Sequence, residues 1–594
     1  MKKLKYIFLL AGALSLASCE SWLDEDPQYT INTKTQFSTV ENARQALMGC
    51  YGYMSADNAY GQAWQEVTFG YCGFGWSQTN GSSTDLLVSM DGGIDETINT
   101  MAWRGMYKVI GETNAFIANI ADSPLESADK LPMEAAARFL RALAYYNLAV
   151  TYGDVPLKTT PSAHDGVAVP RSPKNEVFEL VRTDWEFAYE NLPEKDDDGF
   201  ATKWAAKAYL GKLYHTLGCQ GDNTAWEKAK ACFDEVMSKY RLADKFSDLF
   251  VDYVQGSPES IFQLNFALAG STTRNRGSWL VAPNGSCNGQ AWDRIRASKA
   301  LYDYFLATYP GDPRIESTFL TYWKSYAGVG KGEKPKEEPI ASARDTVYAY
   351  PYFTYTIEGE EKPAGWKKPK LYVGRIPYEK LADPASPKAE ELYAMIADTA
   401  TATPAEKGYL KGLLSLLENA TKKPSTNTKS WPYFKKPWDP EQSGNNSHKN
   451  LILYRYADML LMAADVYNEL GQTDKAITLA NEVLKRARQS GNASQPADWK
   501  SGLSKEQVRE KIYFERIFEG AGEPEMYQKM RLRGTEFLKK AFEVNNGHGI
   551  IQESVANNPK GNGNWGERIF NDGNLNDENF LKKNLLLPVP KDEI

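Results

Sequence analysis

The sequence predicts a mainly α-helical protein, in which a scaffold of helical repeats carries a large, irregular, loop-rich lobe. Apolar residues recur at helical spacing toward both ends of the chain, whereas residues 245–450 are rich in Gly, Pro, Asn, Lys and aromatic residues. The 594 residues suffice for several ordinary domains or one large one. We expect an N-terminal helical region at 31–244, the lobe at 245–450 and a C-terminal helical region at 451–594.

The chain begins with the pattern of a bacterial lipoprotein signal. A basic start precedes an apolar run at 7–16, which is too short to cross a bilayer. The run ends in Leu16-Ala17-Ser18-Cys19, where small residues precede a thiol that can carry lipid. This predicts a signal peptide at 1–18, lipidation of Cys19 and an acidic tether at 19–30, with several acyl chains as a firm anchor. The alternative is an ordinary secretory peptide with a chance cysteine.

The N-terminal region contains four predicted helices. An apolar stripe over 138–150 marks the first, which Gly153 ends and Pro156 keeps from resuming. The other three are expected near 174–191, over 201–217 with an end at Gly218, and near 224–239.

Three helices are expected in the C-terminal region. The first has an apolar stripe from Leu453 to Tyr467 and is ended by Gly471, and the second covers Thr473 to Arg488. Ser504 and Gln507 have the spacing of a capping box for a third helix through about Phe518.

Two helix pairs have the spacing of tetratricopeptide-like repeats, in which small and aromatic residues mesh between antiparallel helices. Because two segments match this spacing, repeats are favoured over two unrelated helical hairpins. The matching residues are Ala464, Tyr467, Gly471 and Ala476 in one pair, and Gly211, Tyr214, Gly218, Ala229 and Phe233 in the other.

Charge and cysteine usage exclude several classes of function. The formal net charge is −7, and it becomes −10 when the three lysines of the signal are removed, which argues against a nucleic-acid partner. Without Cys19, five irregularly spaced cysteines remain and show no disulfide framework, so we expect free buried thiols, although Cys219 and Cys232 could pair. The four histidines are isolated, so neither a zinc site nor a cofactor is predicted.

Several motifs, in order, resemble those of SusD/RagB-type outer-membrane lipoproteins. The hallmark is an Arg-Ala-containing helix followed by Tyr-Gly-Asp-x-Pro-Leu, and the resemblance extends over essentially the whole mature chain. A departure follows Glu519-Gly520, where the usual aromatic-Arg continuation is displaced. The matching segments are 134–157, Arg171-Ser172-Pro173, Thr202-Lys203-Trp204, Gly311-Asp312-Pro313-Arg314, 453–465 and Leu587-Pro588-Val589-Pro590.

The resemblance implies a SusD-like fold and a nutrient-binding protein that is not an enzyme. Such lipoproteins sit on the cell-surface side of the outer membrane, here anchored through Cys19, and pair with a SusC-like TonB-dependent barrel. They capture oligosaccharides or other glycans for uptake, whereas RagB-like members handle peptides. The hallmark motifs are structural in this interpretation, and we expect Arg138, Arg141 and Arg455 to pair with carboxylates inside the scaffold.

Three loop segments offer the aromatic faces and polar groups that a glycan site needs. They lie at 64–85, 274–296 and 322–323, and for each aromatic the alternative is a core contact. The candidate ligand-binding residues are Trp76, Asn80, Asp85, Trp279, Asn288, Trp292, Tyr322 and Trp323.

A lipid-anchored polysaccharide hydrolase is the rival hypothesis. Glu515 and Glu519 share a helix face, but glycosidases hold their carboxylates across a cleft, so this pair is expected to be structural. The Gly-rich segment at 328–332 is no phosphate loop, because Ser or Thr does not follow its lysine.

Overall fold

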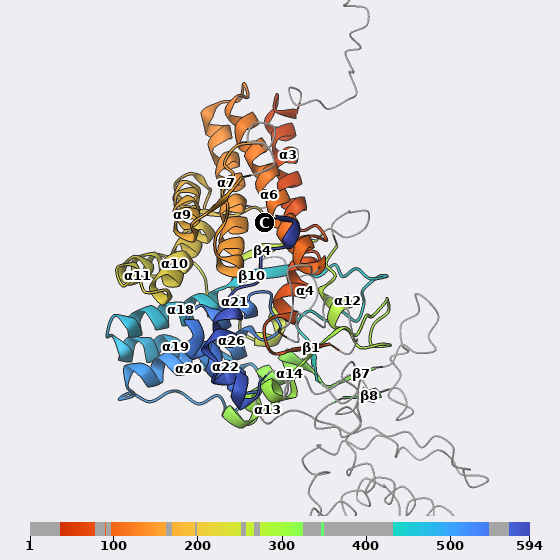
Figure 1. The fold of residues 1–594 in the computed structure, drawn as a ribbon, viewed down its shortest axis with the longest axis vertical. Coiled ribbons are helices and arrows are strands. Elements are labelled where there is room, and N and C mark those ends of the chain that lie inside the picture. The colour runs from red at the N-terminus through yellow and green to blue at the C-terminus, as the bar shows by residue number, and fades with distance from the viewer. Residues whose placement is uncertain are drawn as a thin grey trace, which may run out of the picture.

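The computed structural model describes residues 36–77, 90, 97–161, 169–196, 199–250, 257–266, 274–324, 346–349, 432–545 and 570–593. Their architecture is mainly helical, with short two-stranded antiparallel sheets, which confirms the predicted fold class (Figure 1). None of the described helices combines the length and apolarity that crossing a membrane requires. Cys19, the signal peptide and the tether lie outside these residues, and the expected region boundaries stay predictions.

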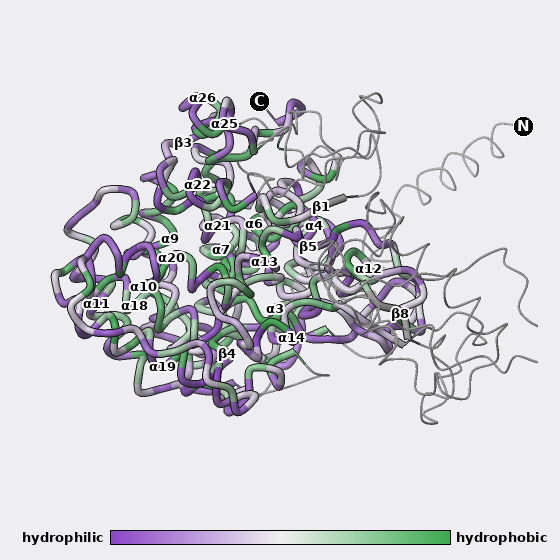
Figure 2. Tube along the Cα trace, turned by 90° about the horizontal axis from the view of Figure 1, so that it is seen from below, coloured by the Kyte–Doolittle hydropathy of each residue, from purple (hydrophilic) through white to green (hydrophobic). Residues whose placement is uncertain are grey.

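The helical scaffold begins with helices that stand side by side in Figure 1 and continues into an arc of helix pairs. Hydrophilic stretches follow its outer rim and hydrophobic stretches lie toward the middle of the molecule (Figure 2). The helices of the N-terminal region are α3 (Val40–Met54), α4 (Ala63–Gly70), α6 (Thr97–Ala121), α7 (Ser127–Tyr152), α9 (Lys174–Asn191), α10 (Lys203–Cys219) and α11 (Ala225–Val236).

Helix α7 is the central element of this region. Every residue from Phe139 to Tyr152 is buried, as expected of a helix that is packed on all sides. Its end at Gly153 confirms the prediction, because Gly153 has a φ of +81° and its N–H donates to the carbonyl of Ala149. The strands β2 (Val155–Pro156) and β3 (Arg171–Ser172) pair just beyond this turn.

The predicted repeat packing is present between α10 and α11. Gly211 lies against Phe233, and a Cβ at position 211 would come 2.4 Å from the Phe233 ring. The expected helix end at Gly218 is wrong, because α10 continues to Cys219. Gly218 instead allows close approach of Trp226, whose ring lies 2.6 Å from where a Cβ would stand.

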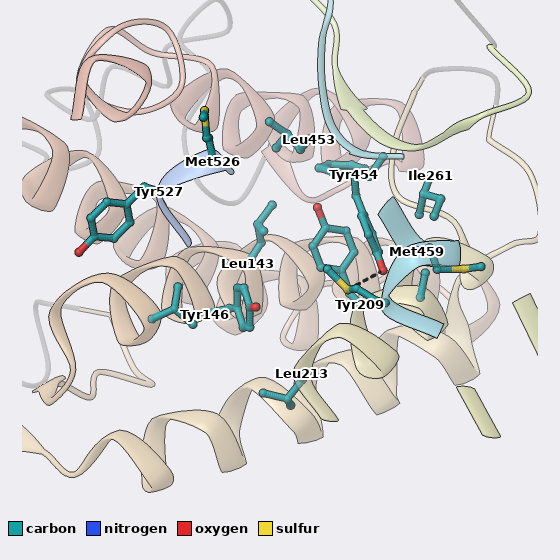
Figure 3. Close-up of a cluster of buried hydrophobic side chains, with 14 of the residues drawn as sticks. Leu143, Tyr146, Tyr209, Leu213, Ile261, Leu453, Tyr454, Met459, Met526 and Tyr527 are labelled. Carbon is teal, nitrogen blue, oxygen red and sulfur yellow. Dashed lines mark hydrogen bonds between the residues drawn. The ribbon is translucent and has the colours of Figure 1, made fainter. Parts of the chain in front are cut away.

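The second repeat pair is formed by α18 (Tyr456–Glu469) and α19 (Thr473–Gln489). The predicted helix start at Leu453 is wrong. Leu453 belongs to strand β10 (Leu451–Arg455), which pairs with β4 (Ser260–Leu264), and the helix begins at Tyr456. This pairing ties the C-terminal region to the lobe. Aromatic and aliphatic side chains of α7, α10, β4, β10 and α18 then meet in one core (Figure 3).

Helix α20 (Lys505–Gly520) starts as predicted, with the Ser504 hydroxyl and the Gln507 side chain forming a capping box. Four shorter helices follow it among the described residues, and the segment after them returns to the first helices. There the Asn99 side chain donates to the Pro588 carbonyl at 2.9 Å, and Leu587 N–H donates to Thr151 at 2.8 Å. The shorter helices are α21 (Met526–Arg531), α22 (Gly534–Glu543), α25 (Asp572–Leu575) and α26 (Glu578–Lys583).

The lobe packs beside α4, and its described elements are short strands and helices (Figure 1). The predicted strand at 261–268 is present as β4, which ends at Leu264. The one at 347–357 is present only at its start, as β8, which ends at Tyr348, and residues 350–357 lie outside the described residues. Strand β1 (Gly75–Ser77) of the N-terminal region joins the lobe by pairing with β5. Besides β4, the lobe contains α12 (Gly277–Val281), α13 (Lys299–Thr308), α14 (Arg314–Thr318), β5 (Ile295–Ala297), β6 (Phe319–Leu320), β7 (Tyr322–Lys324), β8 (Thr346–Tyr348) and β9 (Tyr433–Phe434).

Candidate functional site

Two candidate residues, Trp279 and Trp292, form a stacked pair at the surface of the lobe. Their ring centroids are 4.2 Å apart and the ring planes differ by 20°. Both side chains are partly buried. The backbone fixes the pair, because the N–H of Trp292 donates to the carbonyl of Trp279 at 2.9 Å and Arg294 N–H donates to Leu280 at 3.0 Å. The sequence placed both rings in one segment but did not predict that they stack.

Arg294 covers the second face of Trp292. Its guanidinium carbon lies 3.9 Å from the Trp292 ring centroid, and no group fits between two indoles that are 4.2 Å apart. Both faces of Trp292 are therefore in contact with protein. The guanidinium of Arg276 lies farther off, at 5.7 Å from the Trp279 centroid. The face of Trp279 that points away from Trp292 is the part of this pair that we place in the candidate surface, with Arg276 beside it.

Helix α4 and the turn that precedes it supply the carboxylate and amide groups behind this pair. Glu66, which is 2 % exposed, forms an ion pair with Arg294 at 3.3 Å. Arg276 pairs with Asp57 at 3.0 Å and donates to the Gln62 side chain at 2.6 Å. These four charged residues were not predicted, since the partners in each pair lie more than 200 positions apart and no local spacing in the sequence connects them.

The segment at 322–323 divides between surface and core. Tyr322 is 46 % exposed, whereas Trp323 is 5 % exposed and meets the ring of Tyr433 edge-on at 5.7 Å. Neighbouring residues of a strand point to opposite faces, which explains the division. Trp323 therefore has the core contact that the sequence analysis held as the alternative, and we place only Tyr322 on the candidate surface.

The strand pairings bring the three candidate segments together. Trp76 in β1 is the register partner of Arg296 in β5, two residues beyond Arg294. The N–H of Ala297 in β5 donates to the carbonyl of Pro432, next to β9, and β9 pairs with β6 just before Tyr322.

Asn288 is partly buried, and its N–H donates to the Pro440 carbonyl at 2.8 Å. Asn80 and Asp85 lie outside the described residues, as does the side chain of Trp76.

The carboxylates Glu515 and Glu519 belong to a buried ionic network. Arg314 bonds to both, at 2.9 Å for Glu519, and Arg455 also reaches Glu519 at 2.9 Å. Burial alone would raise the pKa of Glu519, but Arg486, Arg455 and Arg314 hold it well below its usual range. A carboxylate engaged in this way is held ionised by fixed cations. The network ties the lobe helix α14 to β10, α19 and α20.

The expected scaffold ion pairs of the hallmark motifs are confirmed. Arg141 forms two bonds of 2.8 Å with Asp184, and Arg138 joins Asp184 at 3.2 Å and Glu134 at 2.7 Å. Asp184 is fully buried. These arginines fix α7 against α9 and have no part in the candidate surface.

One histidine, which is expected from the sequence to be isolated, lies next to two other side chains of the kinds that bind metal ions. His215, Cys219 and Asp465 offer ligand atoms within 4.8 Å of one another. The His215 Nε2 to Asp465 Oδ2 distance is a hydrogen bond of 2.8 Å, and Arg533 also pairs with Asp465. The carboxylate is therefore already balanced by a fixed cation, and we interpret the group as an ion pair within the scaffold.

A small pocket lies behind α12, between α4 and the start of β10. Lys436 donates to the Glu519 carbonyl and to Glu523, both at 2.6 Å, and so joins the pocket to the ionic network. Gln65 lies against Gly277, where a Cβ would come 2.3 Å from its Oε1. The lining includes Gln65, Phe69, Phe250, Asn275, Lys436 and Glu523.

Solved structures similar to this chain share its fold. A SusD homolog from Bacteroides thetaiotaomicron is 18% identical, with a TM-score of 0.67 over 94% of this chain and 96% of that one. A laminarin binding SusD-like protein is 19% identical, with a TM-score of 0.58 over 94% and 97% of the two chains. These likenesses confirm the expected SusD-like fold.

Sequence comparison gives the family. A SusD-like protein of Formosa agariphila is 24% identical over 544 residues, which are 87% of either chain. A family model described as "Starch-binding associating with outer membrane" matches residues 21–215. The model of the SusD family, whose proteins are non-catalytic binding proteins, matches residues 258–594. Because this match alone covers more than half of the sequence, the chain belongs to the SusD family.

Proposed function

We propose that the chain is a surface lipoprotein that captures oligosaccharides and passes them to a SusC-like TonB-dependent barrel in the outer membrane. The observation that carries the glycan assignment is the stack of Trp279 on Trp292, which fixes the orientation of the Trp279 ring. A flat aromatic face next to polar side chains suits a sugar ring, which has C–H faces and hydroxyl edges.

Family membership and the names of similar proteins support the same proposal. One matching family model is named for starch binding and outer-membrane association, and a similar solved structure is named for laminarin binding. Lipidation at Cys19, surface exposure and the barrel partner are part of the proposal and follow from the signal pattern and the family.

Binding to immobilised or dissolved glycans tests the ligand class. We expect affinity electrophoresis and calorimetry to detect binding to a soluble glycan such as laminarin or starch. Trp279→Ala should weaken it at least tenfold, and Trp279→Phe should retain part of it because an aromatic face remains. Trp204→Ala is the matched control, since Trp204 is a partly buried tryptophan of α10 beside Tyr189.

A folded protein that binds peptides and no glycan would favour the RagB-like alternative.

The lipid anchor and the barrel partner are tested separately in cells. The Cys19→Ala chain should lose its lipid and leave the outer-membrane fraction, and the lipidated chain should co-purify with a TonB-dependent barrel. Recovery of the lipidated chain without any barrel would contradict the partnership.

A further inference from the structure

The charged side chains around the Trp279–Trp292 stack neutralise one another. Arg294, which covers one ring, pairs with Glu66 at 3.3 Å. Arg276, which lies near the other ring, pairs with Asp57 at 3.0 Å. The side chains of Arg294 and Arg276 are only 10% and 16% exposed. Each cation next to the stack therefore already has a carboxylate as its partner.

A third pair lies directly behind the stack. Asp293 and Arg296 are both buried and form an ion pair at 2.8 Å. Asp293 follows Trp292 in the chain and has a φ of +55°, a backbone conformation that non-glycine residues seldom adopt. This turn lets Trp292 and Arg294 lie against each other while Asp293 points to Arg296. The six charged side chains of the three pairs sum to zero net charge.

The zero net charge of these three pairs favours uncharged sugars over acidic ones. A uronate or sulfate group must give up its hydration on binding, which is offset only by a cation with bonding capacity to spare. Here such a group would compete with Glu66 or Asp57 for its arginine and would meet these carboxylates as like charges. A neutral sugar brings neither cost. Its hydroxyls both donate and accept hydrogen bonds.

The Asp57–Arg276 pair suits a hydroxyl better than an anion. Asp57 Oδ1 and Arg276 Nε lack hydrogen-bond partners in the structure, and both atoms are covered. The Asp57 side chain is 35% exposed, and its carboxylate accepts hydrogen bonds, which a hydroxyl can donate and a uronate or sulfate group cannot. We propose that the stack selects uncharged glycans over uronate-containing or sulfated ones, an inference that rests on the proposed function.

Two panels of glycans separate this inference from the proposed function. The neutral panel is laminarin, starch and mannan, and the acidic panel is alginate, polygalacturonate and dextran sulfate, each measured by affinity electrophoresis and calorimetry at low and high salt. We expect binding within the neutral panel, with affinities that change less than about twofold with salt. If the protein prefers acidic glycans and this binding weakens steeply with salt, the proposed selectivity for uncharged glycans is wrong, whereas the proposal of glycan binding stands. Binding of neither panel by the folded protein would instead refute the proposed function.

A charge-release variant tests the mechanism. Asp57→Asn removes the carboxylate from Arg276 at a partly exposed position, so acidic glycans should gain affinity on the order of tenfold. The double variant Asp57→Asn/Arg276→Gln removes both charges and should lose that gain. If Asp57→Asn folds and binds acidic glycans no better than the unmodified chain, pairing with Asp57 does not set the charge selectivity, and the inference is wrong.

Discussion

Phe233 packs directly on the backbone of Gly211, and a Cβ at Gly211 would stand 2.4 Å from Cε1 of its ring. This contact allows α10 and α11 to approach closely, as the repeat spacing predicts. The ring has no room to withdraw, because Phe233 is fully buried.

Gly211→Ala should therefore destabilise the protein, although alanine is the better helix former. We expect a loss of about 1–3 kcal/mol, typical of an overpacked core, and a lower thermal midpoint by calorimetry. Gly49→Ala is the matched control in α3, where no atom lies within 4 Å of the new Cβ. That change should stabilise by about 0.5–1 kcal/mol. Equal effects of the two substitutions would contradict the packing argument.

Glu519→Gln should be among the most destabilising conservative changes in the chain. It leaves Arg314, Arg455 and Arg486 buried around a neutral amide, and breaking a buried ion pair costs about 3–5 kcal/mol. Denaturant unfolding measures the loss. The control is Glu179→Gln, whose carboxylate is 62% exposed and pairs with Arg182, and there we expect a change within about 0.5 kcal/mol. A small effect at Glu519 would mean that the network is dispensable for folding.

Acid should weaken the protein through the same network. Burial alone would raise the pKa of Glu523, but Arg455 and Lys436 lower it from 4.5 to about 2. Since the unfolded chain then binds more protons, this contribution is complete above pH 4.5 and is lost as the pH falls toward 2. Thermal midpoints between pH 6 and 2.5 should fall less steeply for Glu523→Gln than for the unmodified chain. Parallel curves would show that Glu523 does not contribute to the acid dependence.

His215 should act in the opposite direction. Burial alone would lower its pKa, but Cys219 and Asp465 outweigh burial and raise the pKa above 6.5. A raised pKa stabilises the folded state fully below pH 6.5, and that contribution is lost as the pH rises through the folded value. The stability advantage of the unmodified chain over His215→Gln should shrink between pH 6 and 9. An advantage that stays constant would show that folding does not shift the pKa of His215.

Tyr322 and Trp323 should separate binding from stability. Trp323→Ala removes a buried ring that contacts Tyr433 and should cost about 3–5 kcal/mol. Tyr322→Ala changes a side chain that is 46% exposed, so the thermal midpoint should stay within a few degrees while glycan affinity falls. If Trp323→Ala loses glycan affinity without losing stability, Trp323 contacts the ligand and is not a core residue.

Local signals in the sequence predict most of the scaffold. The spacing of apolar residues and the Ser504 cap mark helices that form as expected, because both signals act within a few residues. Leu453 was assigned to a helix because its strand partner lies in β4, nearly 190 residues earlier. The same limit applies to the site. Trp279 and Trp292 were found as candidates, but the arginine that covers Trp292 and its partner Glu66 meet only in the folded chain.

The hydrogen bond from Asn99 to Pro588 spans 489 positions of the chain. Helix α6 therefore cannot complete its contacts until the segment around Pro588 has left the ribosome. The first helices of the scaffold therefore reach their final packing only after the 489 positions between these two residues have been made.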